Sequence, residues 1–283
     1  MLLCLPLLLV AVVPFADPPQ KTVEVALQAP PRPKPKRDVA LPKPAPGDTR
    51  GQAVDRLARM GAAVRSGGGR QRWVALTFDD GPGPYTARVL RELLRLRVPA
   101  TFFQVGRMVL DFPGPAVLTR NTESVTIGDH TYSHALLTAL DRRAQLREIL
   151  IGAAALEHIG IPAPRLFRPP YGAWDADTRA VTRRRGMAIV LWNVDSRDYK
   201  RPGVKRIVRN VVDAVRPGSI VLMHDGGGER TQTIKAIAKI VYRLRRRGYT
   251  FVTVDKMIGG DPPRRRDDFG RIGRRLIGET RGG

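Results

Sequence analysis

Residues 73–105 read WVALTFDDGPGPYTARVLRELLRLRVPATFFQV, and this stretch decides the fold. An apolar run (73–78) ends in an acidic turn, an amphipathic segment (86–97) follows, and a second apolar run occupies 100–105. Short apolar runs rich in β-branched and aromatic residues predict buried strands, and the amphipathic segment predicts a helix. The stretch is therefore a strand–helix–strand unit, which is typical of parallel sheets.

The same alternation continues along the chain to residue 258. Further strands are predicted at 124–128, 165–169, 188–194, 219–223 and 250–254, and further helices at 146–160, 176–187 and 233–248. Alternation over this length predicts an α/β fold with a parallel sheet or barrel. The acidic, histidine and aromatic clusters described below all fall at strand ends, and in a parallel barrel such ends meet on one face.

The N-terminal part of the chain differs in composition from the rest. Residues 2–15 are uncharged and apolar, and such a run is shorter than the ~20 residues of a spanning helix. We therefore expect residues 1–16 to be a signal peptide or membrane anchor and the protein to be extracytoplasmic, secreted or membrane-anchored, and cell-wall associated. Residues 17–72 are rich in Pro and Arg, and they predict a disordered linker in which 53–64 can form a short helix.

The remaining boundaries follow from these assignments. Residues 73–260 are predicted to be the catalytic domain, and residues 261–283 a basic C-terminal tail. Cys4 is the single cysteine, so the chain forms no intrachain disulfide. We expect a monomer.

The chain is strongly basic, with 49 Lys and Arg against 26 Asp and Glu and a formal net charge of +23. Such a charge attracts anionic wall polymers or an anionic membrane surface, although an arginine-rich, solvated surface without a specific partner is the preferred explanation. Specific nucleic-acid binding is not expected, because the sequence has no helix-turn-helix or zinc-finger spacing.

A metal site is predicted from two histidines and one carboxylate. His130 and His134 lie in the cluster HTYSH and would face one metal ion if a helical turn forms there. Asp80, after the first strand, is the natural third ligand. Two histidines and an aspartate leave one coordination position open, as in catalytic zinc sites. Taken alone, the histidine spacing is common on protein surfaces.

Acid–base groups surround this set. Asp79 precedes Asp80, and adjacent side chains in extended backbone point opposite ways, so one carboxylate can bind metal while the other faces a substrate water. Arg168 is predicted to hold Asp79 ionised through a bidentate contact. The alternative for Asp79-Asp80-Gly81-Pro82 is a plain turn, and the alternative for Arg168 is a surface arginine.

Three further positions complete the predicted site. Tyr171 follows two prolines, so its backbone N–H is held in a rigid turn and can face an oxyanion. His224 follows an apolar strand, and Asp195 is predicted to raise its pKa and fix its tautomer; the alternative is a core histidine. His158 belongs to no cluster and is expected to be structural or exposed.

The clusters TFDDGP (77–82), HTYSH (130–134), RPPYG (168–172), DSRDY (195–199) and LMH (222–224) resemble, in this order, the five motifs of the NodB-homology polysaccharide deacetylases, carbohydrate esterase family 4. The resemblance implies a distorted (β/α) barrel of the TIM type. It also implies a metal-dependent hydrolase that removes acetyl groups from an N-acetylated polysaccharide.

Motif by motif, the resemblance implies a role for each residue. Asp79 would be the general base, His224 the general acid tuned by Asp195, and Arg168 a brace for Asp79. The implied metal ligands are Asp80, His130 and His134, with Zn²⁺ as the cofactor and Co²⁺ as another candidate. The oxyanion and acetyl positions would be formed by the Tyr171 N–H, Leu222 and Trp192.

Two positions depart from the family pattern. Asp129 stands where the family often has Asn, beside the first metal histidine, and Tyr199 stands where the family has Trp. The expected substrate is peptidoglycan N-acetylglucosamine or a chitin-like glycan. An esterase on O-acetylated xylan and a catalytically silent glycan-binding module are the alternatives.

Overall fold

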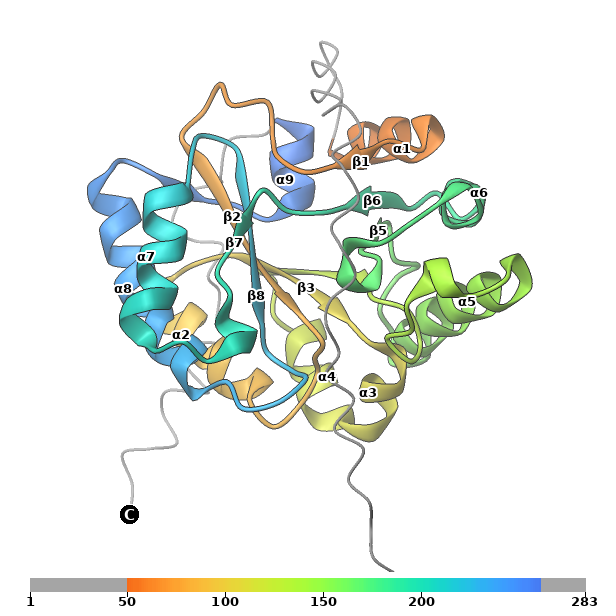
Figure 1. Cartoon of the computed structure of the whole chain (residues 1–283), viewed down its shortest axis with the longest axis horizontal. Coiled ribbons are helices and arrows are strands. Elements are labelled where there is room, and N and C mark those ends of the chain that lie inside the picture. The colour runs from red at the N-terminus through yellow and green to blue at the C-terminus, as the bar shows by residue number, and fades with distance from the viewer. Residues whose placement is uncertain (1–49, 261–283) are drawn as a thin grey trace, which may run out of the picture. The chain divides into compact units, whose positions relative to one another are not determined.

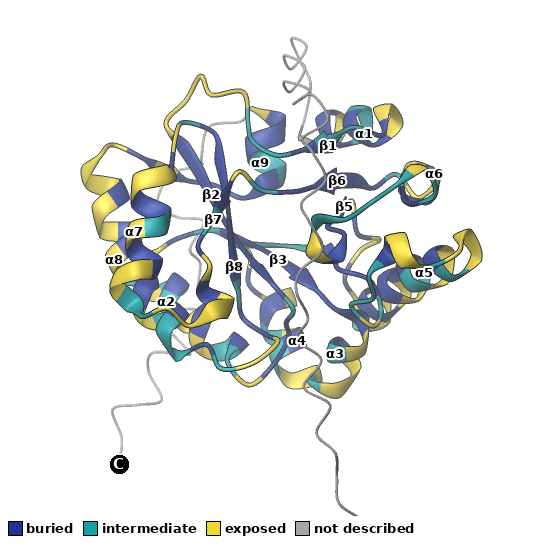
Figure 2. Cartoon of the chain, in the orientation of Figure 1, coloured by how far each residue is buried: buried dark blue, intermediate teal, exposed yellow. Residues whose placement is uncertain are grey.

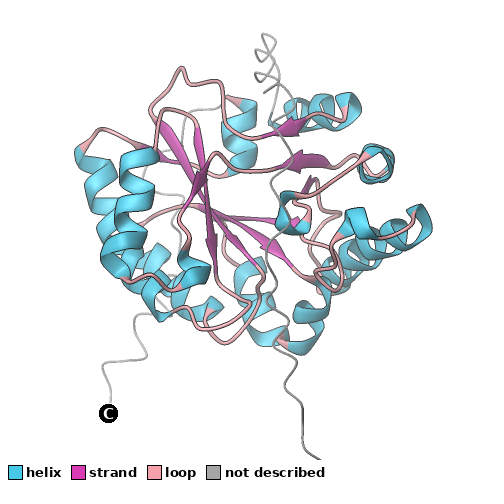
Figure 3. Cartoon of the chain, viewed as in Figure 1, coloured by secondary structure: helices cyan, strands magenta, loops and turns pink. Residues whose placement is uncertain are grey.

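Nine strands form one curved sheet within residues 50–260, the part of the chain that this computed structural model describes, and helices cover its outer side (Figures 1 and 3). Each ladder between neighbouring strands is parallel. The strands are β1 (Ala63–Val64), β2 (Trp73–Asp79), β3 (Ala100–Gln104), β4 (Val125–Asp129), β5 (Leu166–Phe167), β6 (Ala188–Val190), β7 (Val194–Asp195), β8 (Ser219–His224) and β9 (Thr250–Phe251).

Nine α-helices accompany these strands in the described part of the chain. They are α1 (Arg50–Met60), α2 (Thr86–Leu96), α3 (Gly106–Asp111), α4 (Pro113–Arg120), α5 (Arg142–His158), α6 (Ala176–Arg184), α7 (Val204–Ala214), α8 (Thr231–Arg246) and α9 (Val254–Gly259). Short 3₁₀ turns cover Leu137–Ala139, Pro170–Gly172 and Asp198–Lys200. None of the described helices combines the length and the apolar composition needed to span a bilayer.

The sheet runs in the order β1-β6-β5-β4-β3-β2-β8-β7, with β9 beside β2, and it curls into an incomplete barrel. The predicted distorted (β/α) barrel is confirmed. The predicted strand 188–194 is divided, because β6 and β7 lie near opposite ends of the sheet. Residues 191–193 join them: the Leu191 N–H donates to the Val64 carbonyl at 2.7 Å, and the Asn193 N–H donates to the Ile220 carbonyl at 3.2 Å. This short segment bridges the two ends of the open sheet.

The central strand β2 is buried on both faces (Figure 2). Val74, Leu76 and Phe78 pack outward against apolar residues of α2, α7 and α8. Trp73 and Ala75 point inward, where they meet apolar residues of β3, β5, β6 and β8. Since side chains alternate along a strand, Thr77 and Asp79 continue the inward row, and Asp79 is therefore placed inside the barrel at its carboxyl end.

The predicted linker 17–72 extends too far, because its last part belongs to the folded domain. Ala53, Val54 and Leu57 of α1 join the inner apolar cluster, and β1 pairs with β6. The prolines of this segment all precede Arg50, so the part of the predicted linker that folds, residues 50–72, has the arginines and glycines of the linker but none of its prolines. The predicted signal segment 1–16, the rest of the linker and the tail 261–283 lie outside the described residues.

The last predicted strand, 250–254, is also shorter in the structure. Only Thr250 and Phe251 pair with β2, and α9 begins at Val254. Val254, Met257 and Ile258 pack into the same inner cluster as α1. The two helices thus close one end of the barrel interior together.

We expect Leu57→Ala to lower the free energy of unfolding by about 2–4 kcal/mol, because it opens a cavity under α1. Leu57 is 3% exposed, whereas Met60 on the same helix is 50% exposed. Met60→Ala is therefore the control and should change stability by less than about 0.5 kcal/mol. Urea denaturation measures both variants. If both variants change the free energy of unfolding by equal, small amounts, α1 does not belong to the core.

Candidate active site

Three potential metal ligands converge at the carboxyl end of the barrel. Asp80 Oδ1 lies 3.5 Å from His130 Nε2 and 3.2 Å from His134 Nε2, and one ligand atom from each residue lies within 4.8 Å of the others. His130 Nδ1 lies 2.6 Å from the carbonyl oxygen of Arg168. A proton on Nδ1 would donate to this carbonyl, so Nε2 is left with a free lone pair on the side of Asp80.

Asp80 is held in its charged form. Burial raises the pKa of its carboxyl, but the neighbouring imidazoles of His130 and His134 and the positive charge of His224 bring that pKa well below its ordinary value. An ionised carboxylate between two imidazoles is the form required of a metal ligand.

A loop, rather than the predicted helical turn, brings the two histidines together. Thr131 and His134 both have left-handed backbone, with φ of 66° and 63°. The Thr131 hydroxyl accepts the His134 N–H at 3.1 Å, and Asp129 Oδ1 accepts the Thr131 N–H at 3.0 Å. Such backbone is uncommon outside glycine and is concentrated at functional sites; Asp80 and Tyr171 share it, with φ of 72° and 60°.

Asp129, the departure beside His130, supports this loop from behind. Its side chain is fully buried, and a methyl group on Gly152 of α5 would lie 2.5 Å from Asp129 Oδ1. The carboxylate therefore faces helix α5, and it is not among the converging ligand atoms. Burial raises the pKa of Asp129 well above its ordinary value, which favours the protonated form.

Arg168 and Asp79 form a buried ion pair inside the barrel. Arg168 Nη1 lies 2.7 Å from Asp79 Oδ1 and also donates to the Thr77 hydroxyl at 2.7 Å. The contact with Asp79 is made by one nitrogen, so the predicted bidentate fork is wrong. The other guanidinium nitrogens donate to the carbonyls of Val190 and Leu191, at 3.2 and 3.1 Å.

The free oxygen of this carboxylate faces the metal set, since Asp79 Oδ2 lies 3.9 Å from His130 Nε2. The guanidinium also lies 4.1 Å from the centre of the Phe103 ring. Burial lowers the pKa of Arg168, and the charge of Asp79 opposes that shift. A fully buried charge persists only when it is paired in this way.

His224 faces Asp79 across the adjacent strand, because the ladder between β2 and β8 sets Asp79 opposite His224. His224 Nδ1 lies 2.7 Å from Asp198 Oδ1, and Asp198 Oδ2 accepts the His224 N–H at 2.9 Å and the Thr233 hydroxyl at 2.8 Å. Burial alone would lower the pKa of His224, but the charge and hydrogen bond of Asp198 raise it to about 9. His224 is therefore protonated at neutral pH.

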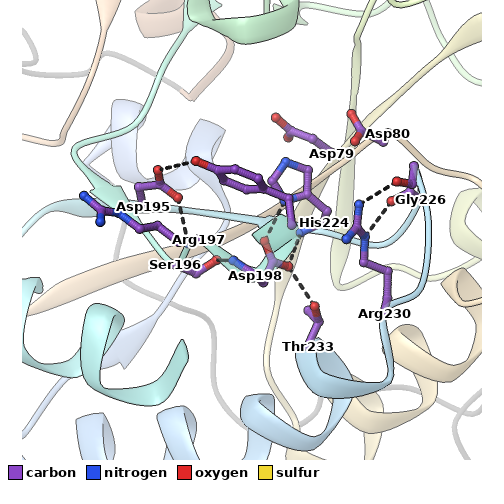
Figure 4. A network of polar contacts seen from close by, with 12 residues as sticks. Asp79, Asp80, Asp195, Ser196, Arg197, Asp198, His224, Gly226, Arg230 and Thr233 are labelled. Atoms are coloured by element: carbon purple, nitrogen blue, oxygen red, sulfur yellow. Dashed lines mark hydrogen bonds and ion pairs between the residues drawn. The ribbon is translucent and has the colours of Figure 1, made fainter. Parts of the chain in front are cut away.

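The predicted partner of His224, Asp195, is wrong: the structure gives that role to Asp198 (Figure 4). Asp195 pairs with Leu222 in the β7–β8 ladder, two residues before His224. The next turn of chain carries Asp198 forward to the level of the imidazole. Both aspartates stand in the cluster DSRDY, and only the strand register distinguishes them.

Asp195 instead supports the residue that departs from the family pattern. Its carboxylate accepts the Arg197 N–H at 2.8 Å and the Tyr199 hydroxyl at 3.3 Å. The Tyr199 ring meets the His224 ring edge to face, with their centres 5.4 Å apart. Asp195 thus reaches the candidate acid through Tyr199.

The remaining predicted residues surround the same site. The Tyr171 side chain is 61% exposed, and its ring lies 4.9 Å from that of His134. Trp192 packs beside Gly172, and its ring lies 5.6 Å from the Arg168 guanidinium carbon. Leu222 is buried on β8, in the inward row that ends at His224. Their roles in oxyanion and acetyl binding stay predictions, and His158 is exposed at the end of α5.

We expect Asp198→Asn to lower the pKa of His224 from about 9, because burial would then oppose the charged form and only the charges of Asp80 and Asp79 would still favour it. Asp195→Asn is the control and should leave that pKa within about half a unit. Histidine NMR titration of the metal-free protein measures both. A large decrease of the His224 pKa in the Asp195 variant alone would instead support Asp195 as the partner of His224.

Comparisons with known proteins agree with this site. The family model described as polysaccharide deacetylase matches residues 66–190. A chitooligosaccharide deacetylase of Bradyrhizobium is 41% identical over 63% of this chain and 87% of its own length. A peptidoglycan-N-acetylglucosamine deacetylase of Bacillus cereus is 38% identical over 66% of this chain and 89% of its own length.

A solved structure shares the fold as well. It is that of a peptidoglycan N-acetylglucosamine deacetylase in complex with a substituted benzamide, and its TM-score is 0.67 at 34% identity, over 69% of this chain and 92% of that one. The relatives are named as deacetylases, and the similarity spans most of their length. The chain belongs to the polysaccharide deacetylase family, and it is a hydrolase.

Proposed function

We propose that the protein is a divalent-metal-dependent deacetylase of an N-acetylated glycan. The observation that carries this proposal is the pairing of Asp79 with His224 across β2 and β8, directly beside the Asp80, His130 and His134 set. A candidate base and a candidate acid thus stand on neighbouring strands at the same level, and Asp79 Oδ2 lies 3.9 Å from His130 Nε2 of the candidate metal set. Hydrolysis of an amide needs both proton transfers and stabilisation of an oxyanion.

The three ligands fit a catalytic zinc site. Two imidazole nitrogens and one carboxylate are ordinary Zn²⁺ donors, and three protein ligands leave a position open. The Nδ1 contact of His130 with the Arg168 carbonyl and the ionised state of Asp80 both favour a bound cation. Co²⁺ accepts the same donors. A bound cation would supply Lewis-acid polarisation of the acyl carbonyl and lower the pKa of water.

The protein's own side chains would move the protons. Asp79, paired with Arg168, takes the proton of the attacking water. His224, protonated because Asp198 raises its pKa to about 9, gives a proton to the departing amine. The Tyr171 N–H is proposed to donate to the developing oxyanion, since Tyr171 lies against His134.

The surroundings support a sugar substrate. Tyr171 and Tyr199 are 61% and 42% exposed, and their rings lie against His134 and His224 respectively. Exposed aromatic rings on two sides of a polar centre suit a glycan chain, which has apolar faces. Leu222 and Trp192 are proposed to contact the acetyl methyl group.

Peptidoglycan N-acetylglucosamine and chitooligosaccharides are the proposed substrates, because the relatives are named for these two glycans. Work on wall peptidoglycan would place the protein outside the cytoplasm, secreted or anchored at the wall. The positive charge of the chain suits that anionic setting. No contact in the described residues favours an acetyl-xylan esterase or a silent glycan-binding module.

We expect acetate release from peptidoglycan or chitooligosaccharide but not from acetylated xylan, and we expect a chelator to abolish it and Zn²⁺ to restore it. Quantifying acetate from the three glycans, with and without chelator, decides between the functions. Release from xylan alone would indicate the esterase. Binding of glycan without release from any of them would indicate the silent module.

Asp79→Asn should lower kcat by about 10²–10⁴-fold, because the general base is lost. The three metal ligands stay in place, so zinc affinity should remain within about tenfold of the wild-type value. Asp213→Asn, at an exposed carboxylate of α7, is the control and should keep full activity. Full activity in the Asp79 variant would contradict its assignment as the base.

A further inference from the structure

The loop between β8 and α8, residues 225–230 (DGGGER), packs against the candidate metal ligand Asp80. The N–H groups of Asp225 and Gly226 both point to the Asp79 carbonyl oxygen, at 3.1 and 3.4 Å. A methyl group on Gly226 would lie 2.2 Å from the Asp80 carbonyl oxygen. The loop therefore approaches the backbone of Asp80 more closely than any residue with a Cβ allows.

Gly227 makes the contact with the carboxylate itself. Its φ is +66°, and a methyl group there would lie 2.5 Å from Asp80 Oδ2 and 3.2 Å from Asp80 Cβ. The other carboxylate oxygen, Oδ1, is the one that faces His130 and His134. Gly227 thus packs behind the carboxylate on the side away from the histidines and limits its rotation about χ1 and χ2.

Arg230 holds this loop in shape. The side chain is only 3% exposed, and its guanidinium donates to the carbonyls of Gly226 and Gly227, at 2.7 and 2.8 Å (Figure 4). A third, longer contact of 3.4 Å reaches the carbonyl of Glu229. A buried guanidinium whose hydrogen bonds go to backbone carbonyls of its own loop fixes the path of that loop.

We propose that Gly227 and Arg230 are positioning residues for the metal ligand Asp80. Gly227 sets the orientation of the carboxylate, and Arg230 sets the position of Gly227. The inference rests on the proposed metal site and adds two residues that contact neither the substrate nor the ion. Mutation of supporting residues of this kind usually weakens metal binding by about 10–100-fold.

A plain structural role is the competing explanation, since a tight turn also needs glycine. Gly228 and Gly186 are controls that distinguish the positioning role from the plain structural role. Gly228 has a φ of +130°, and a methyl group there would come no closer to a non-neighbouring residue than 3.9 Å, from Arg230 Nη2. Gly186 has a φ of +67°, and a methyl group there would meet no non-neighbouring atom within 4 Å. Alanine at Gly186 meets the same left-handed backbone as alanine at Gly227, and alanine at Gly228 meets a φ that is less favourable still, but neither methyl group approaches Asp80.

The experiment measures the Zn²⁺ dissociation constant of the metal-free full chain by competition with a chromophoric chelator. We expect Gly227→Ala to weaken zinc binding at least about tenfold, and Gly228→Ala and Gly186→Ala to stay within about twofold. Arg230→Lys should also weaken binding, because one ammonium does not reproduce the fork to two carbonyls. Arg246→Lys, at an exposed position of α8, is its control. Thermal unfolding in chelator confirms that each variant is folded.

The outcomes separate this inference from the proposed function. Tight zinc binding by the wild type, with unchanged affinity in Gly227→Ala and Arg230→Lys, overturns the positioning role and leaves the metal site intact. Equal losses in Gly227→Ala and Gly228→Ala also overturn it, because strain alone would then be sufficient. If Gly227→Ala does not fold, Arg230→Lys decides. Failure of the wild type to bind zinc overturns the inference and the proposed function together.

Discussion

The buried contact between Arg168 and Asp79 connects the barrel interior to the site above it. Arg168 is fully buried, and its guanidinium joins β2, through Thr77 and Asp79, to the carbonyls of Val190 and Leu191 at the end of β6. Its own backbone carbonyl meets His130. One residue therefore aligns the candidate base, a candidate metal ligand and the end of β6, and loss of its charge partner would leave a buried cation without compensation.

A second pair of a carboxylate and a nitrogen base lies on the neighbouring strand. In the first pair Arg168 contacts the candidate base Asp79, and in the second Asp198 contacts the candidate acid His224. The two pairs are set opposite each other by the β2–β8 register. Asp79 and His224 can keep separate roles as base and acid because each has its own counter-ion, Arg168 or Asp198. The two groups therefore do not need to form an ion pair with each other.

Much of this arrangement is predictable from the sequence, because hydrophobic periodicity and short motifs are local. The strand 73–78 lies where the pattern places it, and the candidate ligands Asp80, His130 and His134 come together as the prediction requires. Register and long-range packing are not local. The choice of Asp198 over Asp195 depends on the β7–β8 ladder, and the place of α1 depends on contacts with residues far along the chain. The contact of Gly227 with Asp80 has no signal in the sequence beyond a run of glycines.

The pairing of β1 with β6 has a consequence for how the chain folds. Helix α1 and β1 are the first described elements to be synthesised, yet their partners include β6 and α9 near the other end of the domain. Contacts between distant parts of a chain slow folding. The apolar face of α1 must wait, uncovered, until the C-terminal half has been made, and exposed apolar surface of this kind promotes aggregation. Docking of α1 and β1 therefore cannot be completed before β6 and α9 have been synthesised.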